Sequence, residues 1–267
     1  MTAMSNSAAD HSPHDSHGPA GAPSIDYGSY LRLPELLELQ TLQSSPEHPD
    51  ELLFIVVHQA SELWFKVLRH EMHTMITALE SFDTMRALLA VQRVNVLTEI
   101  IAQQLSSLDT LPPQRFAQFR GYLGSSSGSQ SAQFRAIEAT AGLRDPHFLA
   151  AITEHGEPPA VVKEALARPV LQSLVLALIE HEKMDLAELY MGPSPTPLFL
   201  LVEGLLEFEQ RFARWRFLHV QLVERIIGPG TFGTGGTLGA KYLSRTVSQR
   251  FFPELWAVRS KFYGTAK

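Results

Sequence analysis

The sequence contains no cysteine in its 267 residues. Disulfide bonds, thiolate nucleophiles, iron–sulfur clusters, cysteine-ligated haem and the usual structural zinc sites are therefore excluded together. Any metal would have to be held by nitrogen or oxygen atoms. The chain also lacks an apolar run of the roughly 20 residues that cross a bilayer, and it has no N-terminal basic region followed by a hydrophobic core. We therefore expect a cytoplasmic protein that does not interact with a membrane.

Clusters of basic residues are missing as well. The chain has 22 Lys and Arg residues against 28 Asp and Glu residues, which gives a formal net charge of -6. Such a surface has no general attraction for nucleic acid or for an anionic membrane. The hydrophobic content of 45% is enough to bury a substantial core. The expected partner is a small molecule rather than a polyanion.

Several catalytic signatures are absent. No Glu is followed three residues later by His, which argues against a di-iron carboxylate bundle. The His-Glu-x-x-His motif of zinc hydrolases is also missing. The run GTGGT at 233–237 follows a helical pattern rather than a strand, and no Lys comes after it, so a phosphate-binding loop is unsupported. A cover over a small ligand suits this run better.

Helical periodicity dominates what is present. No segment shows convincing period-two alternation, so the predicted fold class is all-α, a helical bundle. Residues 1–24 are rich in Ser, Ala, Pro, Gly, Asp and His and carry almost no large apolar side chain. Such a segment cannot recover the entropy of ordering by burial. We therefore expect a disordered N-terminal tail over 1–24 and a single all-helical domain over 25–267.

Three long helices carry the strongest patterns. They are expected at 50–82 with Asp50 as the N-cap, at 84–109, and from Leu198 to Gly228, where glycine can take the positive φ that ends a helix. The first of them is expected to reach the core through Ile55, Leu63, Phe65, Leu68, Met72, Met75 and Leu79.

Shorter helices are expected between and after the long ones. The Pro112–Pro113 break starts a short helix that ends near Leu123, and 124–131 form a loop. Residues 145–190 should contain two modest helices, and 251–262 form a short amphipathic piece that can pack onto the bundle.

Two histidines face the interior in this pattern. His219 lies on an apolar helical stripe, and His58 lies on the helix expected at 50–82, with Phe54 and Glu62 four residues to either side. A histidine in an apolar slot is either a core residue bonded to a backbone carbonyl or the axial ligand of a buried flat cofactor such as haem. With two histidines, one could be the proximal ligand of the iron and the other its distal partner.

Polar residues that could bind an amino acid accompany the histidines. Arg120 projects from an apolar segment beside a serine-rich loop. It is either a surface or salt-bridged arginine or a clamp for a carboxylate, because guanidinium binds carboxylate through two parallel hydrogen bonds. The hydroxyl of Thr234, in the GTGGT run, could assist it at the ammonium and carboxylate end of a ligand.

Four motifs in order make the sequence resemble the tryptophan 2,3-dioxygenase family. They are YGSYLRL at 27–33, ELLFIVVHQASELWFK at 51–66, FRGYLGSSSGSQSAQFRAIE at 119–138, and FLHVQLVERIIG followed by GTGGT within 217–237. The resemblance implies an all-helical homotetramer with one haem b between the long helices of each subunit. The implied reaction inserts both atoms of O2 across the C2–C3 bond of L-tryptophan to give N-formyl-L-kynurenine, the first step of tryptophan catabolism by the kynurenine pathway.

The resemblance also assigns roles to individual residues. It makes His219 the proximal haem ligand, His58 the distal histidine that faces the indole nitrogen, and Ser127 a loop residue near the haem edge. Arg120 would pair with the substrate carboxylate. Thr234 would contact the substrate ammonium, and Phe54 and Leu123 would form the pocket walls. Tyr27 would be contributed by the N-terminal segment of a neighbouring subunit.

Two departures from the family pattern leave alternatives open. Phe116 stands where the family usually has a tyrosine that helps to hold the carboxylate, which removes a hydrogen bond worth about 1 kcal/mol. Ser129 replaces a phenylalanine near the haem. A related haem-dependent monooxygenase that acts on tryptophan, methyl-tryptophan or tyrosine is therefore the alternative enzyme, and a haem or tryptophan sensor the non-enzymatic one.

Overall fold

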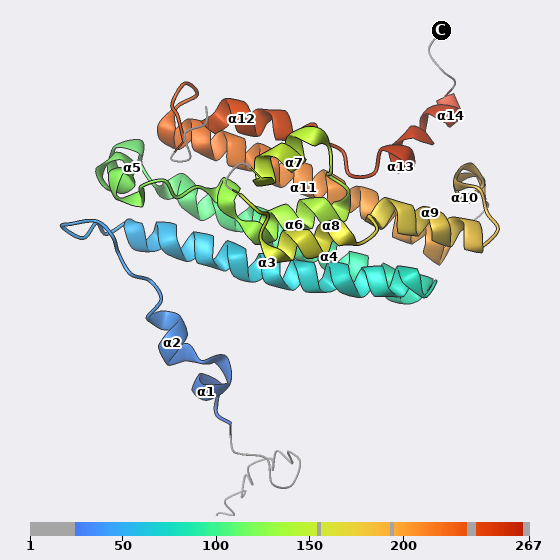
Figure 1. The fold of residues 1–267 in the computed structure, drawn as a ribbon, viewed down its shortest axis with the longest axis horizontal. Helices are drawn as coiled ribbons and strands as arrows, with labels where there is room; N and C mark the ends of the chain where they lie inside the picture. The colour runs from blue at the N-terminus through green and yellow to red at the C-terminus, as the bar shows by residue number, and fades with distance from the viewer. Residues whose placement is uncertain (1–24, 154–155, 193–194, 234–238, 264–267) are drawn as a thin grey trace, which may run out of the picture. The chain divides into compact units, whose positions relative to one another are not determined.

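The computed structural model describes residues 25–153, 156–192, 195–233 and 239–263, and every element in these ranges is a helix (Figure 1). The all-α prediction is confirmed. The tail expected at 1–24 lies outside the described residues. The chain divides into two compact units, Met1–Thr41 and Leu42–Lys267. This division falls inside the single domain expected for 25–267, which stays a prediction.

The N-terminal unit contains two short helices, α1 (Tyr27–Leu31) and α2 (Leu33–Leu37). Asp26 caps α1, because its Oδ1 accepts the Ser29 backbone N–H at 2.8 Å. As expected, a proline opens the second helix. Apolar side chains along this unit are largely open to solvent, and Tyr27 is 75% exposed. The others are Ile25, Tyr30, Leu31, Leu37 and Leu39.

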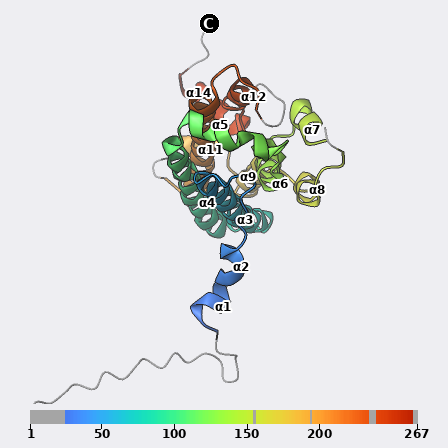
Figure 2. The ribbon, with the colours of Figure 1, turned by 90° about the vertical axis from the view of Figure 1, so that its left-hand side faces the viewer.

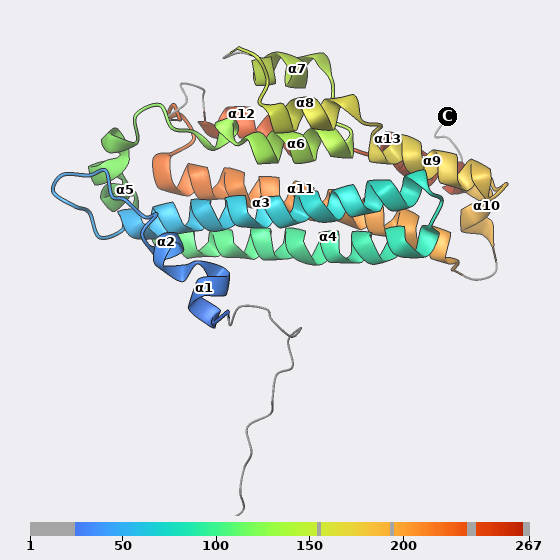
Figure 3. The ribbon, with the colours of Figure 1, turned by 60° about the horizontal axis from the view of Figure 1, so that its bottom comes forward.

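Three long helices form the centre of the larger unit: α3 (Glu51–Glu80), α4 (Thr84–Gln104) and α11 (Pro197–Ile227). They run side by side, and α4 contacts both of the others (Figure 3). Their apolar stripes meet in one large core, as the periodicity predicts. Gly204 permits the close approach of α4 and α11, because a Cβ atom there would meet Val91 Cγ1 at 2.8 Å.

A second group of helices covers α3. α6 (Ala132–Ala141) and α9 (Leu171–His181) contact α3, and α8 (Ala160–Ala167) packs on α6. α7 (Pro146–Thr153) precedes α8 in the chain, and α10 (Leu186–Met191) contacts α11. Figure 2 shows α6, α7 and α8 together on one side of α3 and α4.

The prediction of two helices over 145–190 is wrong, because the described residues of that range form four. Pro169 cannot donate a backbone N–H, so α8 and α9 remain separate helices. After α9 the backbone at Lys183 takes a left-handed conformation with φ 56, which ends that helix before α10.

The C-terminal segment returns onto α11. α12 (Gly239–Thr246), which the periodicity did not reveal, packs against α11 and is followed by α13 (Pro253–Ala257) and α14 (Ser260–Tyr263). Buried Glu209 on α11 accepts the Phe251 and Phe252 N–H groups at 2.7 and 2.8 Å and the Trp256 Nε1–H at 2.7 Å. The expected packing of 251–262 on the bundle is confirmed.

The ends of the long helices differ from the sequence prediction in detail. Asp50 precedes α3, but its side chain does not cap the helix and instead accepts Arg115 Nη2–H at 2.9 Å. The helix expected at 84–109 finishes as the 3-10 turn η1 (Leu105–Thr110). Leu63 is 53% exposed, so its assignment to the core is wrong. Gly228 ends α11 with φ 85, as predicted.

The elements that carry the site lie at one end of the long helices. They are α5 (Pro113–Arg120), the 3-10 turns η2 (Gly121–Leu123) and η3 (Gly128–Gln130), and the first turns of α3 (Figure 1).

Within the described ranges, no helix is both long enough and apolar enough to cross a membrane.

Candidate active site

The proton on the His58 ring can be placed from its hydrogen bond. Nδ1 lies 2.7 Å from the Phe54 carbonyl oxygen, one turn earlier on α3. A carbonyl can only accept, so Nδ1 carries the hydrogen. In the neutral ring Nε2 is then the acceptor, and it is free to receive an N–H group from a ligand.

The His58 ring combines solvent access with close packing against protein atoms. Its side chain is open to solvent on one side. Protein atoms nevertheless enclose the ring closely, because burial lowers the pKa of His58 by more than the Phe54 carbonyl and the Glu62 carboxylate raise it. At neutral pH the His58 imidazole is therefore uncharged.

His219, on α11, is the second uncharged histidine of this region. Burial, together with repulsion from His58, lowers the pKa of His219 to about 4. The repulsion also means that the two rings lie close enough to interact. The Trp215 ring stacks on His219 with centroids 5.4 Å apart. No hydrogen-bond partner for the His219 ring nitrogens is found among the described residues.

The surroundings of His219 fit a metal ligand. A core histidine satisfied by a backbone carbonyl was the other interpretation of this residue, and the described residues contain no such bond. A neutral imidazole with free nitrogens is the form that binds iron. The described residues contain no group of three or more histidine, aspartate or glutamate side chains that could hold a metal ion. Single-histidine ligation, as in a b-type haem, is the arrangement that this donor set can supply.

Aromatic side chains form one wall beside His58. Phe54 lies 5.5 Å from Phe116 and 5.8 Å from Phe119, measured between ring centroids, and Phe116 is 5.2 Å from Phe119. Leu123 and the end of α11 pack against the same cluster. Because α3, α5, η2 and α11 all contribute, the wall joins the two histidine-bearing helices. It can hold a flat apolar group.

Arg120 lies at the C-terminal end of α5 and is half-buried. Its Nη2–H donates to the Phe232 carbonyl, just after α11. No acidic side chain pairs with Arg120 in the described parts of the chain. Guanidinium has five N–H donors, and the Phe232 carbonyl is the partner of one of them. Thr234, predicted to act beside Arg120, lies outside the described residues.

Ser127 is held by its own loop. Its hydroxyl lies 2.9 Å from that of Ser129, and its N–H donates to Gln130 Oε1 at 3.1 Å. Arg135 Nε donates to the Ser129 carbonyl at 3.3 Å, which ties the loop to α6. Ser129, where the sequence departs from the family pattern, thus bonds the serine that is expected near the haem edge.

The structure brings together some of the predicted residues and not others. His58, His219, Phe54, Phe116, Leu123 and Arg120 gather at the same end of the larger unit. Tyr27 belongs to the N-terminal unit. Sequence reasoning overlooked two residues as parts of the site. Trp215 stands one turn before His219, and helical spacing could have identified it. Phe119 is 0% exposed and supports Phe54 and Phe116.

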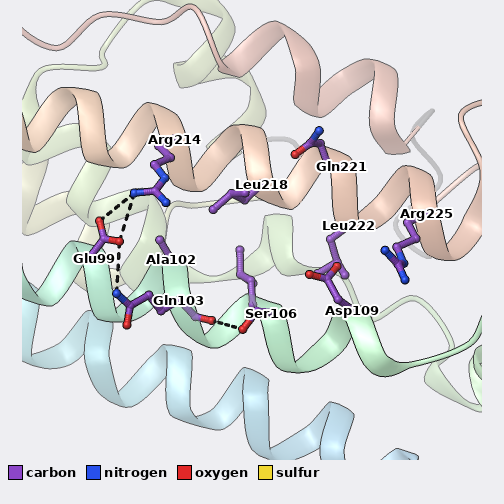
Figure 4. A pocket seen from close by; sticks show the side chains of 11 residues that line it. Glu99, Ala102, Gln103, Ser106, Asp109, Arg214, Leu218, Gln221, Leu222 and Arg225 are labelled. Atoms are coloured by element: carbon purple, nitrogen blue, oxygen red, sulfur yellow. Dashed lines mark hydrogen bonds and ion pairs between the residues drawn. The ribbon is translucent and has the colours of Figure 1, made fainter.

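A separate cavity of about 810 Å³ lies between α4, η1 and α11 (Figure 4). Neither histidine lines it. Arg214 at one end is paired with Glu99, at 3.3 Å. Its lining contains none of the aromatic side chains that surround His58.

Comparisons with known proteins agree with the four motifs. The family model described as tryptophan 2,3-dioxygenase matches residues 11–158 and 186–262, which include all the candidate residues. The chain is 38% identical over 261 residues to a tryptophan 2,3-dioxygenase of Kineococcus radiotolerans, covering 89% of this chain and 91% of the relative. It is 40% identical over 262 residues to that of Herpetosiphon aurantiacus, covering 88% and 98%.

Proposed function

The chain belongs to the tryptophan 2,3-dioxygenase family and is an oxygen-incorporating oxidoreductase that acts on tryptophan, and we propose that it cleaves the indole C2–C3 bond of L-tryptophan at a haem held by His219. The product would be N-formyl-L-kynurenine. The observation that supports this site best is the pair of enclosed, uncharged histidines, His58 and His219, on facing helices. The matches favour this reaction over the monooxygenase alternative.

His219 would hold the iron of haem b. Its pKa of about 4 keeps the imidazole deprotonated, so no proton competes with the metal at neutral pH. Haem, when bound, supplies the chemistry that binds and activates O2. Trp215 stacks on the imidazole and would keep its plane fixed. Ser127 is assigned to the haem edge on the family resemblance alone.

His58 would orient the indole rather than transfer a proton. Its Nδ1–H bond to the Phe54 carbonyl fixes the ring and leaves Nε2 as the acceptor for the indole N–H. This single bond would define which edge of the indole faces the haem. Burial lowers the pKa of His58, so the ring stays neutral and Nε2 can accept that bond at neutral pH.

The other end of the substrate would be held by charge. Arg120 lies one helical turn after Phe116 and has no acidic partner in the described chain. A substrate carboxylate would therefore pair with its guanidinium. Phe54, Phe116 and Leu123 would contact the indole ring. Thr234 would add a contact at the ammonium end.

We also propose that the active enzyme is a homotetramer in which the N-terminal segment enters a neighbouring subunit's active site. Two five-residue helices cannot bury the tyrosine and leucine side chains that this segment exposes. A partner surface would cover them. Tyr27, at 75% exposed, would be the residue contributed to the neighbouring site.

Substitution of the two histidines separates their roles. His219→Ala should lose the Soret band of a histidine-ligated haem, whereas His58→Ala should retain that band and lose turnover. His181→Ala is a control, since His181 stacks on Phe82 at 4.0 Å outside the site. A normal haem spectrum in His219→Ala would disprove the ligand assignment, and unchanged turnover in His58→Ala would disprove the orienting role.

A further inference from the structure

Glu51, the first residue of α3, is a buried carboxylate with an unusual set of partners. It is 0% exposed. Its Oε1 accepts the Gln43 N–H at 2.9 Å, and its Oε2 accepts the Ser44 N–H at 3.0 Å and the Ser44 hydroxyl at 2.5 Å. All three donors come from two consecutive residues at the start of the larger unit. Burial raises the pKa of Glu51, but these hydrogen bonds outweigh burial and lower it overall, so the carboxylate is ionised.

The bonds to Glu51 continue toward α5. The Ser44 hydroxyl accepts the His48 N–H at 2.8 Å. The His48 ring nitrogen Nε2 lies 2.9 Å from Gln118 Oε1, and the ring packs 5.1 Å from Phe119. The segment 43–48 is therefore fixed at one end by Glu51 and rests on α5 at the other.

A second bond joins the same segment to η2, which follows α5. The Tyr122 hydroxyl donates to the Ser45 carbonyl at 2.6 Å. Tyr122 is two residues beyond Arg120. The segment 43–48 therefore contacts the chain on both sides of Arg120, before it in α5 and after it in η2. The Asp50–Arg115 ion pair is a further polar link between the start of α3 and α5.

The placement of Glu51 on α3 connects this anchor with the proposed substrate site. Residues 51, 54 and 58 are spaced three and four apart, so Glu51, Phe54 and His58 share one face of the helix. The carboxylate thus lies at the end of the row that forms the indole wall. It touches neither the proposed haem nor the proposed substrate.

We propose that Glu51 is a positioning residue that holds the segment 43–48 against α5 and so sets the distance between Arg120 and His58. The proposal rests on the proposed function, because that function assigns the substrate carboxylate to Arg120 and the indole to His58. If the two groups must bind opposite ends of one molecule, their separation determines affinity for tryptophan. Loss of the anchor should weaken substrate binding and leave the reaction of bound substrate intact.

Glu51→Gln tests the proposal with little change in size. An amide nitrogen cannot accept a hydrogen bond, so at least one backbone N–H of the segment 43–48 would lose its partner. We expect KM for L-tryptophan to rise about tenfold, equivalent to about 1.4 kcal/mol, with kcat and haem content unchanged. The matched control is Glu71→Gln, which removes another buried carboxylate of α3, paired with Arg93 at 2.9 Å. It should leave KM unchanged.

Tyr122→Phe provides a second variant in case Glu51→Gln folds poorly. It removes only the hydroxyl bond to the Ser45 carbonyl from a side chain that is partly open to solvent. KM should again rise, by about threefold, the effect of a neutral hydrogen bond worth somewhat less than 1 kcal/mol. If both variants kept the wild-type KM, or if kcat fell while KM did not change, the positioning role would be wrong.

Hydrogen exchange separates this role from the proposed reaction. Backbone amides in 43–48 and 116–123 should exchange at least about tenfold faster in Glu51→Gln than in the wild type, whereas Glu71→Gln should leave both segments protected. Unchanged protection of 116–123 in Glu51→Gln would overturn the proposal. If the wild type failed to oxidise tryptophan, the proposed function would fail, and the exchange comparison would still decide whether Glu51 holds α5.

Discussion

Restoring a hydroxyl at position 116 offers a quantitative test of how the substrate carboxylate is held. Phe116 is 7% exposed and packs between Phe54 at 5.5 Å and Phe119 at 5.2 Å. Without substrate, the hydroxyl of Phe116→Tyr would be largely buried without a defined partner, which costs about 1–3 kcal/mol of stability. With tryptophan bound, the hydroxyl would donate to the carboxylate beside Arg120 and contribute about 1 kcal/mol to binding.

The expected result for Phe116→Tyr is a lower thermal stability without substrate and a KM for L-tryptophan about fivefold below that of the wild type. Thermal unfolding with and without tryptophan, together with steady-state kinetics, measures both effects. Phe119→Tyr is the matched control. It places the same hydroxyl in a site that is 0% exposed, so it should lose stability and gain no affinity. An unchanged or higher KM in Phe116→Tyr would refute the placement of the carboxylate near α5.

Three further outcomes follow from the charges of the larger unit. The low pKa of His219 means that the folded protein favours the neutral ring. The haem-free protein should therefore lose up to about 3 kcal/mol of stability as pH falls from 6.5 to about 4. Urea unfolding should show a smaller loss in His219→Phe than in the wild type, and an equal loss would contradict this. Arg120→Leu should raise KM for L-tryptophan at least about thirtyfold. Binding of tryptamine, which lacks the carboxylate, should change little. Equal losses for both ligands would refute the pairing of Arg120 with the substrate carboxylate. Arg216→Met should destabilise the protein by about 1–3 kcal/mol, because Glu138, at 1% exposed, loses one of its two arginine partners and keeps Arg135 at 2.7 Å. Adding Glu138→Leu should recover part of this loss in chemical denaturation, and no recovery would assign the loss to packing.

The long helices could be read from the sequence because a single periodic stripe determines each of them. The patterns around Phe65 and His219 span several turns, so α3 and α11 were predicted within a few residues. Residues 145–190 were misjudged because α7 to α10 are each only a few turns long. Their limits depend on local features, such as Pro169 and the left-handed backbone at Lys183, that periodicity does not measure.

The candidate site was predictable only in part. Motifs identified His58, His219 and Arg120, but not the tautomer of His58, which follows from the position of the Phe54 carbonyl. Nor could they reveal that Arg120 bonds the Phe232 carbonyl, since the two residues are far apart in the chain. Glu51 was unremarkable in sequence, because a glutamate in the first turn of a helix is common. Glu51 is buried because the segment 43–48 bonds its carboxylate, and this tertiary contact leaves no pattern in the sequence.

The most direct test of the reaction is the fate of labelled oxygen. The protein, loaded with haem and reduced, would be incubated with L-tryptophan under ¹⁸O2, and the product analysed by mass spectrometry and by N-formylkynurenine absorbance. We predict a product that has gained both oxygen atoms of one O2 molecule, with His58→Ala reducing its rate of formation. A product that has gained a single oxygen atom, with the indole ring intact, would contradict the assignment as a dioxygenase.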